Sequence, residues 1–324
     1  MPWRFATRCI PELLLGSLFA WLAGPLSAQD LAPRAYIITP VDSNAITLTW
    51  SFYNGGLNFN GAIPITGLQV SATGTYSVPT FSYYHSFNFL GRSANITTAL
   101  PYGVGTFEGE IQAGEQQLKR SVYRSGLLDF STRFSVNLLG GPAMSVPKFA
   151  KWKQKVLLGV SLKVIAPTGQ YDAARVVNWG IHRWAFKPEL GYSERWGNWL
   201  LDAYAGAWFY TSNSASFDLP TPKPQTEEPI GSIEAHLSHD FAHGTWVSLD
   251  GNFWWGGVTT LNGVRNLATR QTSSRIGISA AWRFATHQSI KASYSSGTYI
   301  RFGGDYQNLQ VAWQYSWIGG PQHR

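Results

Sequence analysis

Cysteine, charge and long apolar runs are all scarce in this sequence. The 324 residues include a single cysteine, Cys9, so the chain forms no intramolecular disulfide. Charged residues make up 13% of the chain, whereas soluble globular domains carry about 25%. Polarity comes instead from Ser, Thr, Asn and Gln, and glycine is frequent, with 33 residues.

The missing apolar runs exclude one class of membrane protein. After residue 28 there is no stretch of about 18 apolar residues, so a membrane-spanning helix is not expected. Basic residues are scattered, although the formal net charge is +7. Because nucleic-acid-binding domains carry a basic stripe on one face, the sequence does not predict nucleic acid as a partner.

The first 28 residues have the pattern of an export signal. Arg4 and Arg8 form a basic start, and an apolar run follows from Leu13 to Ala23. We expect cleavage after Ala28. Residues 29–44 are then predicted to form a short periplasmic segment that packs under or into the lumen of the following domain.

Apolar and polar residues alternate with a period of two in most of the remaining chain. In the segment 128–138, Leu128 and Phe130 share one face, while Asp129 and Arg133 share the other. A period of two indicates a strand with one apolar face, whereas a helix would repeat every three to four residues. Such runs cover residues 46–52, 81–89, 94–100, 128–138, 156–166, 184–192, 199–211, 230–240, 245–255, 273–284, 288–299 and 308–317.

The links between these runs alternate in length. Short links are expected at 91–92, 196–198, 241–244 and 285–287, with a medium one at 140–151. Long links are expected at 54–74, 102–121, 168–182, 212–229 and 256–272. Outer-membrane barrels alternate short periplasmic turns with longer outer loops in this way.

The sequence therefore predicts an all-β fold, a transmembrane antiparallel up-and-down β-barrel of about twelve strands in a bacterial outer membrane. The barrel is expected over residues 45–317, with a C-terminal tail at 318–324. Trp184, Trp199, Trp255 and other tryptophans fall near strand ends, where they would form a girdle at the membrane interface. A soluble β-sandwich is the alternative, but it would not explain the alternating links.

Several short motifs resemble a known family. They are Pro33-Arg34-Ala35-Tyr36 with Pro40 and Asn44, Tyr53-Asn54-Gly55-Gly56 with Phe59 and Pro64-Ile65, and Ala166-Pro167-Thr168-Gly169 with Tyr171-Asp172. In this order they resemble the MetA-pathway of phenol degradation family of Gram-negative outer-membrane barrels, which are called transporters. The resemblance implies porin-like uptake, in some members of aromatic or other apolar compounds.

The C-terminus departs from the usual pattern of such barrels. They commonly end on an aromatic residue that the outer-membrane insertion machinery reads, whereas residues 318–324 follow Trp317 here. We still expect that machinery and outer-membrane lipid as partners, since Trp313, Tyr315 and Trp317 keep the alternating aromatic pattern.

The inward face of the barrel supplies the candidates for a solute pathway. If alternation is carried through, the charged ones are Asp129, Arg133, Lys155, Lys163, Lys187, Glu189, Asp202, Glu234, Asp250, Arg275, Arg283 and Lys291. The aromatic ones are Tyr204, Trp208, Trp246 and Trp254. The charges either pair as scaffolding or bias the pathway toward anionic and neutral solutes. The rings either stack on a flat solute or fill the lumen.

We predict passive passage of a small solute, aromatic or otherwise apolar, with no cofactor and no metal. An outer-membrane enzyme of the phospholipase type is one alternative, for which His236 and Ser238 on one strand face are the pair to inspect. No Gly-x-Ser-x-Gly motif accompanies them, and His236 and His239 lie on opposite strand faces, which disfavours a shared metal. A plugged structural or adhesive barrel is the other alternative.

Overall fold

The computed structural model describes residues 31–58, 68–113, 116–175, 177–218 and 221–319. The predicted export signal, residues 1–28, and residues 320–324 of the predicted tail lie outside these ranges. The strands of the main sheet are β1 (Ser43–Asn58), β2 (Leu68–Phe89), β3 (Arg92–Ala113), β4 (Gln116–Leu127), β5 (Ser131–Leu139), β6 (Val156–Ile165), β7 (Ala185–Trp196), β8 (Trp199–Tyr210), β11 (Ile230–Asp240), β12 (Trp246–Gly256), β15 (Gln271–Ala285), β16 (Gln288–Ile300) and β17 (Gly303–Ile318).

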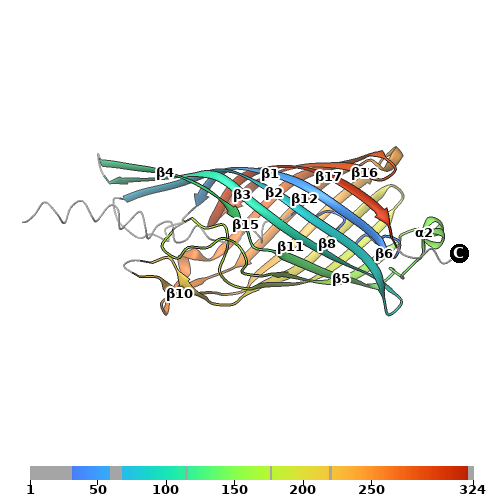
Figure 1. Cartoon of the computed structure of the whole chain (residues 1–324), viewed down its shortest axis with the longest axis horizontal. Coiled ribbons are helices and arrows are strands. Elements are labelled where there is room, and N and C mark those ends of the chain that lie inside the picture. The colour runs from blue at the N-terminus through green and yellow to red at the C-terminus, as the bar shows by residue number, and fades with distance from the viewer. Residues whose placement is uncertain (1–30, 59–67, 114–115, 176, 219–220, 320–324) are drawn as a thin grey trace, which may run out of the picture.

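These strands form one antiparallel sheet that closes on itself (Figure 1). The first strand, β1, pairs with the last, β17, and β2 pairs with both β1 and β3. Because β4 and β5 both pair with β3, they are two parts of a single barrel strand. The predicted barrel of twelve strands is therefore confirmed.

Five of the predicted runs, 156–166, 199–211, 230–240, 245–255 and 288–299, agree with their strands to within one residue at each end. Six others, 46–52, 81–89, 94–100, 184–192, 273–284 and 308–317, fall short of the strand at one end or both. The run 128–138 differs at its start. Leu128–Phe130, predicted as the start of a continuous strand, lies between β4 and β5. The backbone N–H of Leu128 still donates to Pro101 O, at 3.0 Å. Asp129 turns its carboxylate to the backbone N–H groups of Gly169 and Ile181, at 2.8 and 2.7 Å, and these bonds replace the strand ladder.

The exposed face of the barrel is apolar and the buried face is polar. On β12, Leu249 is 66% exposed, whereas its neighbours Ser248 and Asp250 are 1% and 2% exposed. A protein folded in water shows the opposite arrangement. A lipid-facing outer surface around a polar lumen explains the pattern.

The helices of the structure are short. They are α2 (Val146–Lys151) and the 3-10 turns η2 (Ala242–Gly244) and η3 (Leu267–Thr269). Within the described ranges, no helix has the length and apolar character that crossing a membrane requires.

The short links lie where the sequence predicts them, and the medium link contains α2. The start of β1 and the end of β17 lie at the same end, since Ser43 pairs with Ile318. We call this the turn end, and the opposite end the loop end; the topology of outer-membrane barrels assigns the turn end to the periplasm.

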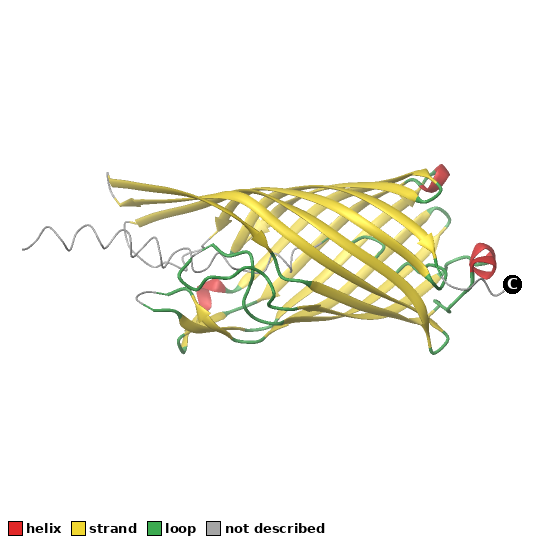
Figure 2. Ribbon diagram, in the orientation of Figure 1, coloured by secondary structure: helices red, strands yellow, loops and turns green. Residues whose placement is uncertain are grey.

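Two of the predicted long links are wrong in extent. Residues 54–58, 68–74, 102–113 and 116–121 belong to strands that project beyond the loop end as long hairpins (Figure 2). The sequence indicates loops there because glycine is frequent. In the structure these glycines give space to rings instead: a Cβ at Gly105 would lie 2.2 Å from Tyr76 Cβ.

The other outer links carry a small second sheet at the loop end. It contains β9 (Asn213–Ser216), β10 (Lys223–Glu227), β13 (Thr259–Leu261) and β14 (Val264–Asn266), in the order β14-β13-β10-β9. The ranges 212–229 and 256–272, predicted as plain loops, thus form short strands that pair with each other. Glu227 of β10 forms a buried ion pair with Arg183.

Candidate functional site

The first part of the described chain, residues 31–42, lies inside the barrel. Tyr36 and Ile38 are 1% and 2% exposed. Ile38 packs with Met144 and Leu157 near the turn end, and Phe149 of the α2 helix packs against this cluster. Side chains of β2, β5, β6, β7, β8, β11 and β12 contact the rest of the segment.

Tyr36 is held by its hydroxyl and by its ring. The hydroxyl bonds with Ser161 Oγ at 2.9 Å and donates to Glu189 Oε1 at 3.1 Å. The ring lies 5.1 Å from that of Tyr204, and the Arg133 guanidinium lies 4.7 Å from its centroid. Burial, reinforced by Glu189, raises the pKa of Tyr36 to about 12, so the hydroxyl stays protonated and remains a donor.

Arg34 is the second attachment point of the segment. Its backbone N–H donates to Asp202 Oδ2 at 3.2 Å, and its Nε donates to Ser238 Oγ at 3.3 Å. Its guanidinium pairs with Asp240 at 2.6 Å and lies 4.4 Å from the Trp246 ring. Through its backbone N–H and its side chain, this one residue contacts β8, β11 and β12.

Inward-facing side chains of β5, β7 and β11 form a compact ion-pair network beside this segment. Lys187 Nζ lies 2.6 Å from Glu189 Oε2 and 3.0 Å from Glu234 Oε1. Arg133 adds a contact of 3.3 Å to Glu189 Oε1. Paired charges of this kind satisfy one another, which favours the scaffolding interpretation for these four residues.

The candidate enzyme pair does not form. His236 turns Nδ1 to Asp250 Oδ1, at 2.9 Å, and is 1% exposed. Ser238 accepts a bond from Arg34 instead, and no hydrogen bond joins Ser238 to His236 within the described ranges. Nor do the described residues contain a group of three or more His, Cys, Asp or Glu side chains suited to a metal ion.

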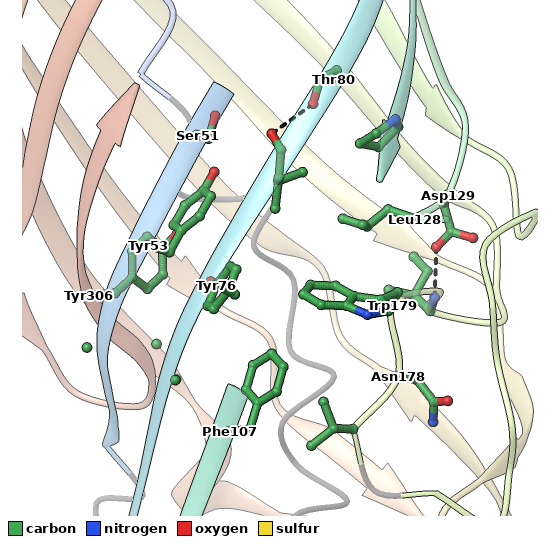
Figure 3. A pocket seen from close by; sticks show the side chains of 18 of the residues that line it. Ser51, Tyr53, Tyr76, Thr80, Phe107, Leu128, Asp129, Asn178, Trp179 and Tyr306 are labelled. Atoms are coloured by element: carbon green, nitrogen blue, oxygen red, sulfur yellow. Dashed lines mark hydrogen bonds between the residues drawn. The ribbon is translucent and has the colours of Figure 1, made fainter. Parts of the chain in front are cut away.

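A cavity of about 460 Å³ opens inside the loop-end half of the barrel. Five rings form one wall of it (Figure 3), and together we call them the aromatic cluster: Tyr53, Tyr76, Phe107, Trp179 and Tyr306.

The rings of the aromatic cluster contact one another in sequence. Tyr53 stacks on Tyr76 at 4.7 Å, and Tyr76 stacks on Phe107 at 5.5 Å. Trp179 meets Tyr76 and Phe107 edge-on at 5.9 and 5.6 Å. Tyr306 meets Tyr53 edge-on at 5.1 Å. The five rings therefore form one continuous aromatic surface in the lumen.

Glycines in the strands make room for this surface. A Cβ at Gly103 would lie 2.4 Å from the Trp179 ring, and one at Gly55 would lie 2.3 Å from Tyr306 Cα. The residues that complete the cavity are mostly small or polar, with Thr49, Ser51 and Thr80 from β1 and β2. The backbone is thus shaped to hold large rings on one side of an open space.

Five of the predicted lumen residues line this cavity or a second one beside it. Asp129 and Lys163 line the aromatic cavity, and Asp250, Arg275 and Lys291 line the second cavity.

The four predicted aromatic residues all face inward, but they pack against other groups. Trp208 and Trp254 are fully buried in a cluster with Ile165 and Ile230. Tyr204 packs on Tyr36, and its hydroxyl accepts the backbone N–H of Ala35 at 3.0 Å. Trp246 lies beneath Arg34, as described above. The packing favours the filling interpretation for these residues.

Two predicted lumen residues lie at the turn end instead. Lys155, directly before β6, and Arg283, near the end of β15, are both exposed. Arg283 lies beside the Gly244 turn, where its Nε would be 3.3 Å from an added Cβ. Alternation predicts which face of a strand a residue lies on, but it does not predict which inward-facing positions lie beyond the enclosed part of the lumen.

The sequence prediction omits the aromatic cluster, although part of the signal is present. Extending the alternation of β1 from Ser51 and of β17 from Asn308 places Tyr53 and Tyr306 inward. Tyr76 lies just after the predicted loop 54–74, and Phe107 lies within the predicted loop 102–121. Trp179 belongs to the link between β6 and β7, where no period exists to indicate its direction.

Comparison with known proteins agrees with this architecture. The sequence matches the family model described as "Putative MetA-pathway of phenol degradation" over residues 48–306. The structure is similar to an outer membrane channel from Pseudomonas putida F1, with a TM-score of 0.70, 15% identity, and coverage of 89% of this chain and 100% of that chain.

A more distant likeness is to the transport unit of the autotransporter AIDA-I from Escherichia coli. It has a TM-score of 0.52 and 9% identity, and covers 96% of this chain and 99% of that chain. No curated protein sequence matches the chain. At these identities the structural likeness establishes the fold, a barrel of the outer membrane.

Proposed function

The chain belongs to the family described as "Putative MetA-pathway of phenol degradation" and is an outer-membrane β-barrel of the channel type, and from this premise we propose that its solutes are small aromatic compounds. They cross by diffusion through the lumen, down their own gradient. The observation that carries the proposal is the aromatic cluster, which faces a cavity of about 460 Å³.

The size and surface of the cavity suit a single-ring solute. Sites for small molecules have volumes of about 300–1,000 Å³ and apolar walls with few polar groups. Aromatic pairs gain about 0.5–1.5 kcal/mol beyond the burial of their area. A solute ring stacked on Tyr76, Phe107 or Trp179 therefore gains enough to favour it over an aliphatic molecule of equal size, yet is held weakly enough to leave.

The polar lumen gives the solute hydroxyl a route past the rings. Thr49, Ser51 and Thr80 line the same cavity and both donate and accept hydrogen bonds. A phenolic hydroxyl can exchange water for these side chains as the ring moves. Conduction of this kind needs several weak sites in series rather than one tight site.

A plugged structural barrel is the second candidate, and one observation favours it. Residues 31–42 occupy the turn-end half of the lumen, and Trp208 and Trp254 are fully buried. A channel needs a path beside these groups, whereas a structural barrel needs none. Single-channel recording separates the two, because a plugged barrel carries no current.

The test of the proposed function is the interruption of single-channel current by solutes of equal shape. Phenol and cyclohexanol differ mainly in the aromatic ring, so we expect phenol to interrupt the current several-fold more often through the wild-type protein. Phe107→Ala or Trp179→Ala should abolish the difference. Trp255→Ala, which removes a ring that is 44% exposed on the outer face, should preserve it.

Equal interruption by phenol and cyclohexanol in the wild-type protein would overturn the proposal. The enzyme alternative is tested in the same preparation by incubation with phospholipid vesicles. Release of fatty acid that a His236→Asn variant abolishes would favour the enzyme instead.

A further inference from the structure

A second cavity, of about 300 Å³, adjoins the aromatic cavity inside the barrel. Tyr53, Tyr306 and Gln310 line both spaces, so the two are in series along the lumen. The N-terminal segment closes one side of the second cavity through Leu31 and Ala32. A solute that leaves the aromatic cluster past Tyr53 and Tyr306 enters this space.

The charges around the second cavity are unequal. It has two cations, Arg275 and Lys291, and one carboxylate, Asp250. The oxygens of Asp250 are already engaged by Ser248 Oγ at 2.6 Å, Ser279 Oγ at 2.6 Å and His236 Nδ1 at 2.9 Å. Asp250 is therefore committed to three hydrogen bonds within the wall, and its single charge faces two cations.

The Lys291 ammonium faces this cavity. Its Nζ lies 5.7 Å from the centroid of the Trp246 ring. Throughout the described ranges, no carboxylate lies within ion-pair distance of it. A partly buried ammonium without a carboxylate partner is costly, and an anion that enters the cavity lowers that cost.

Arg275 adds a second positive group on the side of the aromatic cluster. It is 1% exposed, and its guanidinium lies 4.2 Å from the centroid of the Tyr306 ring. One of its terminal nitrogens donates to Ser295 Oγ at 3.1 Å. Tyr306 thus contacts both Arg275 and the rest of the aromatic cluster, so a positive charge lies next to the last ring of the cluster. Ser293 and Ser295 supply hydroxyl donors beside it.

We propose that the second cavity is an anion subsite and that the solutes of the channel are aromatic carboxylates rather than neutral phenols. The inference rests on the proposed function, since the aromatic cluster receives the ring before the second cavity receives the carboxylate. A carboxylate in this cavity accepts hydrogen bonds from Lys291 and the neighbouring serines, and charge-assisted bonds are the stronger kind.

The test compares benzoate, phenol and benzylammonium, which are aromatic solutes of similar size with negative, zero and positive charge. Each is added to the refolded full-length protein at pH 7, and the dwell time of current interruptions is recorded. We expect benzoate to dwell about tenfold longer than phenol, because one charge-assisted hydrogen bond contributes enough for that factor. Benzylammonium should dwell least. Acetate, which has the carboxylate without a ring, should interrupt the current more weakly than benzoate.

Lys291→Gln is the decisive variant. It should bring the benzoate dwell time to within about twofold of that of phenol, while the phenol dwell time stays unchanged. Lys291→Arg should retain the preference. Arg283→Gln is the matched control, because it removes the same charge from an exposed position outside the cavity, and it should leave all dwell times unchanged. Heat-modifiable migration on a gel verifies that each variant is folded.

Failure of this inference is distinguishable from failure of the proposed function. Equal dwell times for benzoate and phenol in the wild-type protein overturn the anion subsite, and so does a Lys291→Gln variant that keeps the preference. If Phe107→Ala then still abolishes the difference between phenol and cyclohexanol, the aromatic pathway stands without the subsite. If Phe107→Ala changes the dwell time of neither benzoate nor phenol, the proposed function itself fails.

Discussion

Arg34 and Asp240 form an ion pair of 2.6 Å that joins the N-terminal segment to β11, across the interior of the barrel. The pair lies near the turn end, and both side chains are largely buried, at 13% and 27% exposure. Asp240 also pairs with Arg195 of the barrel wall. The segment is thus attached to a carboxylate that the wall itself holds in place.

Loss of this attachment should widen the path through the lumen. Arg34→Gln removes the ion pair and the contact with Trp246, and loss of a charged hydrogen bond costs about 1.5–3 kcal/mol. We expect the segment to detach part of the time, which single-channel recording would register as a higher or more variable conductance. Arg195→Gln removes the other partner of Asp240 without touching the segment. Because the Arg34–Asp240 pair remains in Arg195→Gln, its effect on conductance should be smaller; an equal effect of both variants would refute a specific role of the segment.

The position of the Tyr36 ring requires a glycine at residue 191. A Cβ at Gly191 would lie 2.1 Å from the Tyr36 ring, so Gly191→Ala displaces the ring or bends β7. Overpacking of this kind costs about 1–3 kcal/mol, and we expect the urea midpoint of the refolded barrel to fall. Gly251→Ala is the matched control, since its nearest neighbour would be 3.9 Å away, and it should change the free energy of unfolding by less than about 0.5 kcal/mol. Equal midpoints for the two variants would contradict the close packing.

Lys187 is predicted to be essential for the stability of the wall. Lys187→Met leaves Glu189 and Glu234 without their shared cation, and breaking a buried pair costs about 3–5 kcal/mol. Lys119 provides the comparison, because its pair with Glu108 is exposed, at 60% and 45%. Lys119→Met should cost less than about 1 kcal/mol. Urea unfolding of both variants in the same detergent would measure the difference, and similar midpoints would count against the network.

A charged residue on the outer face should destabilise the barrel only where lipid covers that face. Leu249→Lys places an ammonium on the apolar band of β12, where the cost is about 2 kcal/mol or more near the middle of a membrane. Val264, in β14 of the small sheet, is even more exposed, at 72%. Val264→Lys should nevertheless be neutral, because it lies outside the barrel wall. Folding yield into lipid vesicles measures both, and equal yields would argue that the β12 face is in water.

The alternation of side chains predicts most of the fold because a barrel strand has only two faces. Lys187, Glu189 and Glu234 are assigned inward from parity alone, and the structure brings them into one network. Parity does not reveal which inward charges meet, since that depends on strand register. Nor does it reveal the direction of Trp179, which has no strand to fix its period.

Glycine is where the sequence misleads most. Gly74, Gly103 and Gly105 resemble turn residues, yet they lie within strands and leave space for the rings of Tyr76, Phe107 and Trp179. The predicted strands of the β1–β2 and β3–β4 hairpins are therefore too short, and the prediction omits most of the aromatic cluster. A glycine two or four residues from an aromatic residue of the same face is the signal that would have found it.

The location of an aromatic solute tests the central claim most directly. A crystal of the full-length protein soaked with 4-bromophenol would show the bromine by its anomalous scattering. The account predicts a peak inside the barrel, against Tyr76, Phe107 and Trp179. A peak confined to the outer face, or to the space between detergent and strands, would contradict it.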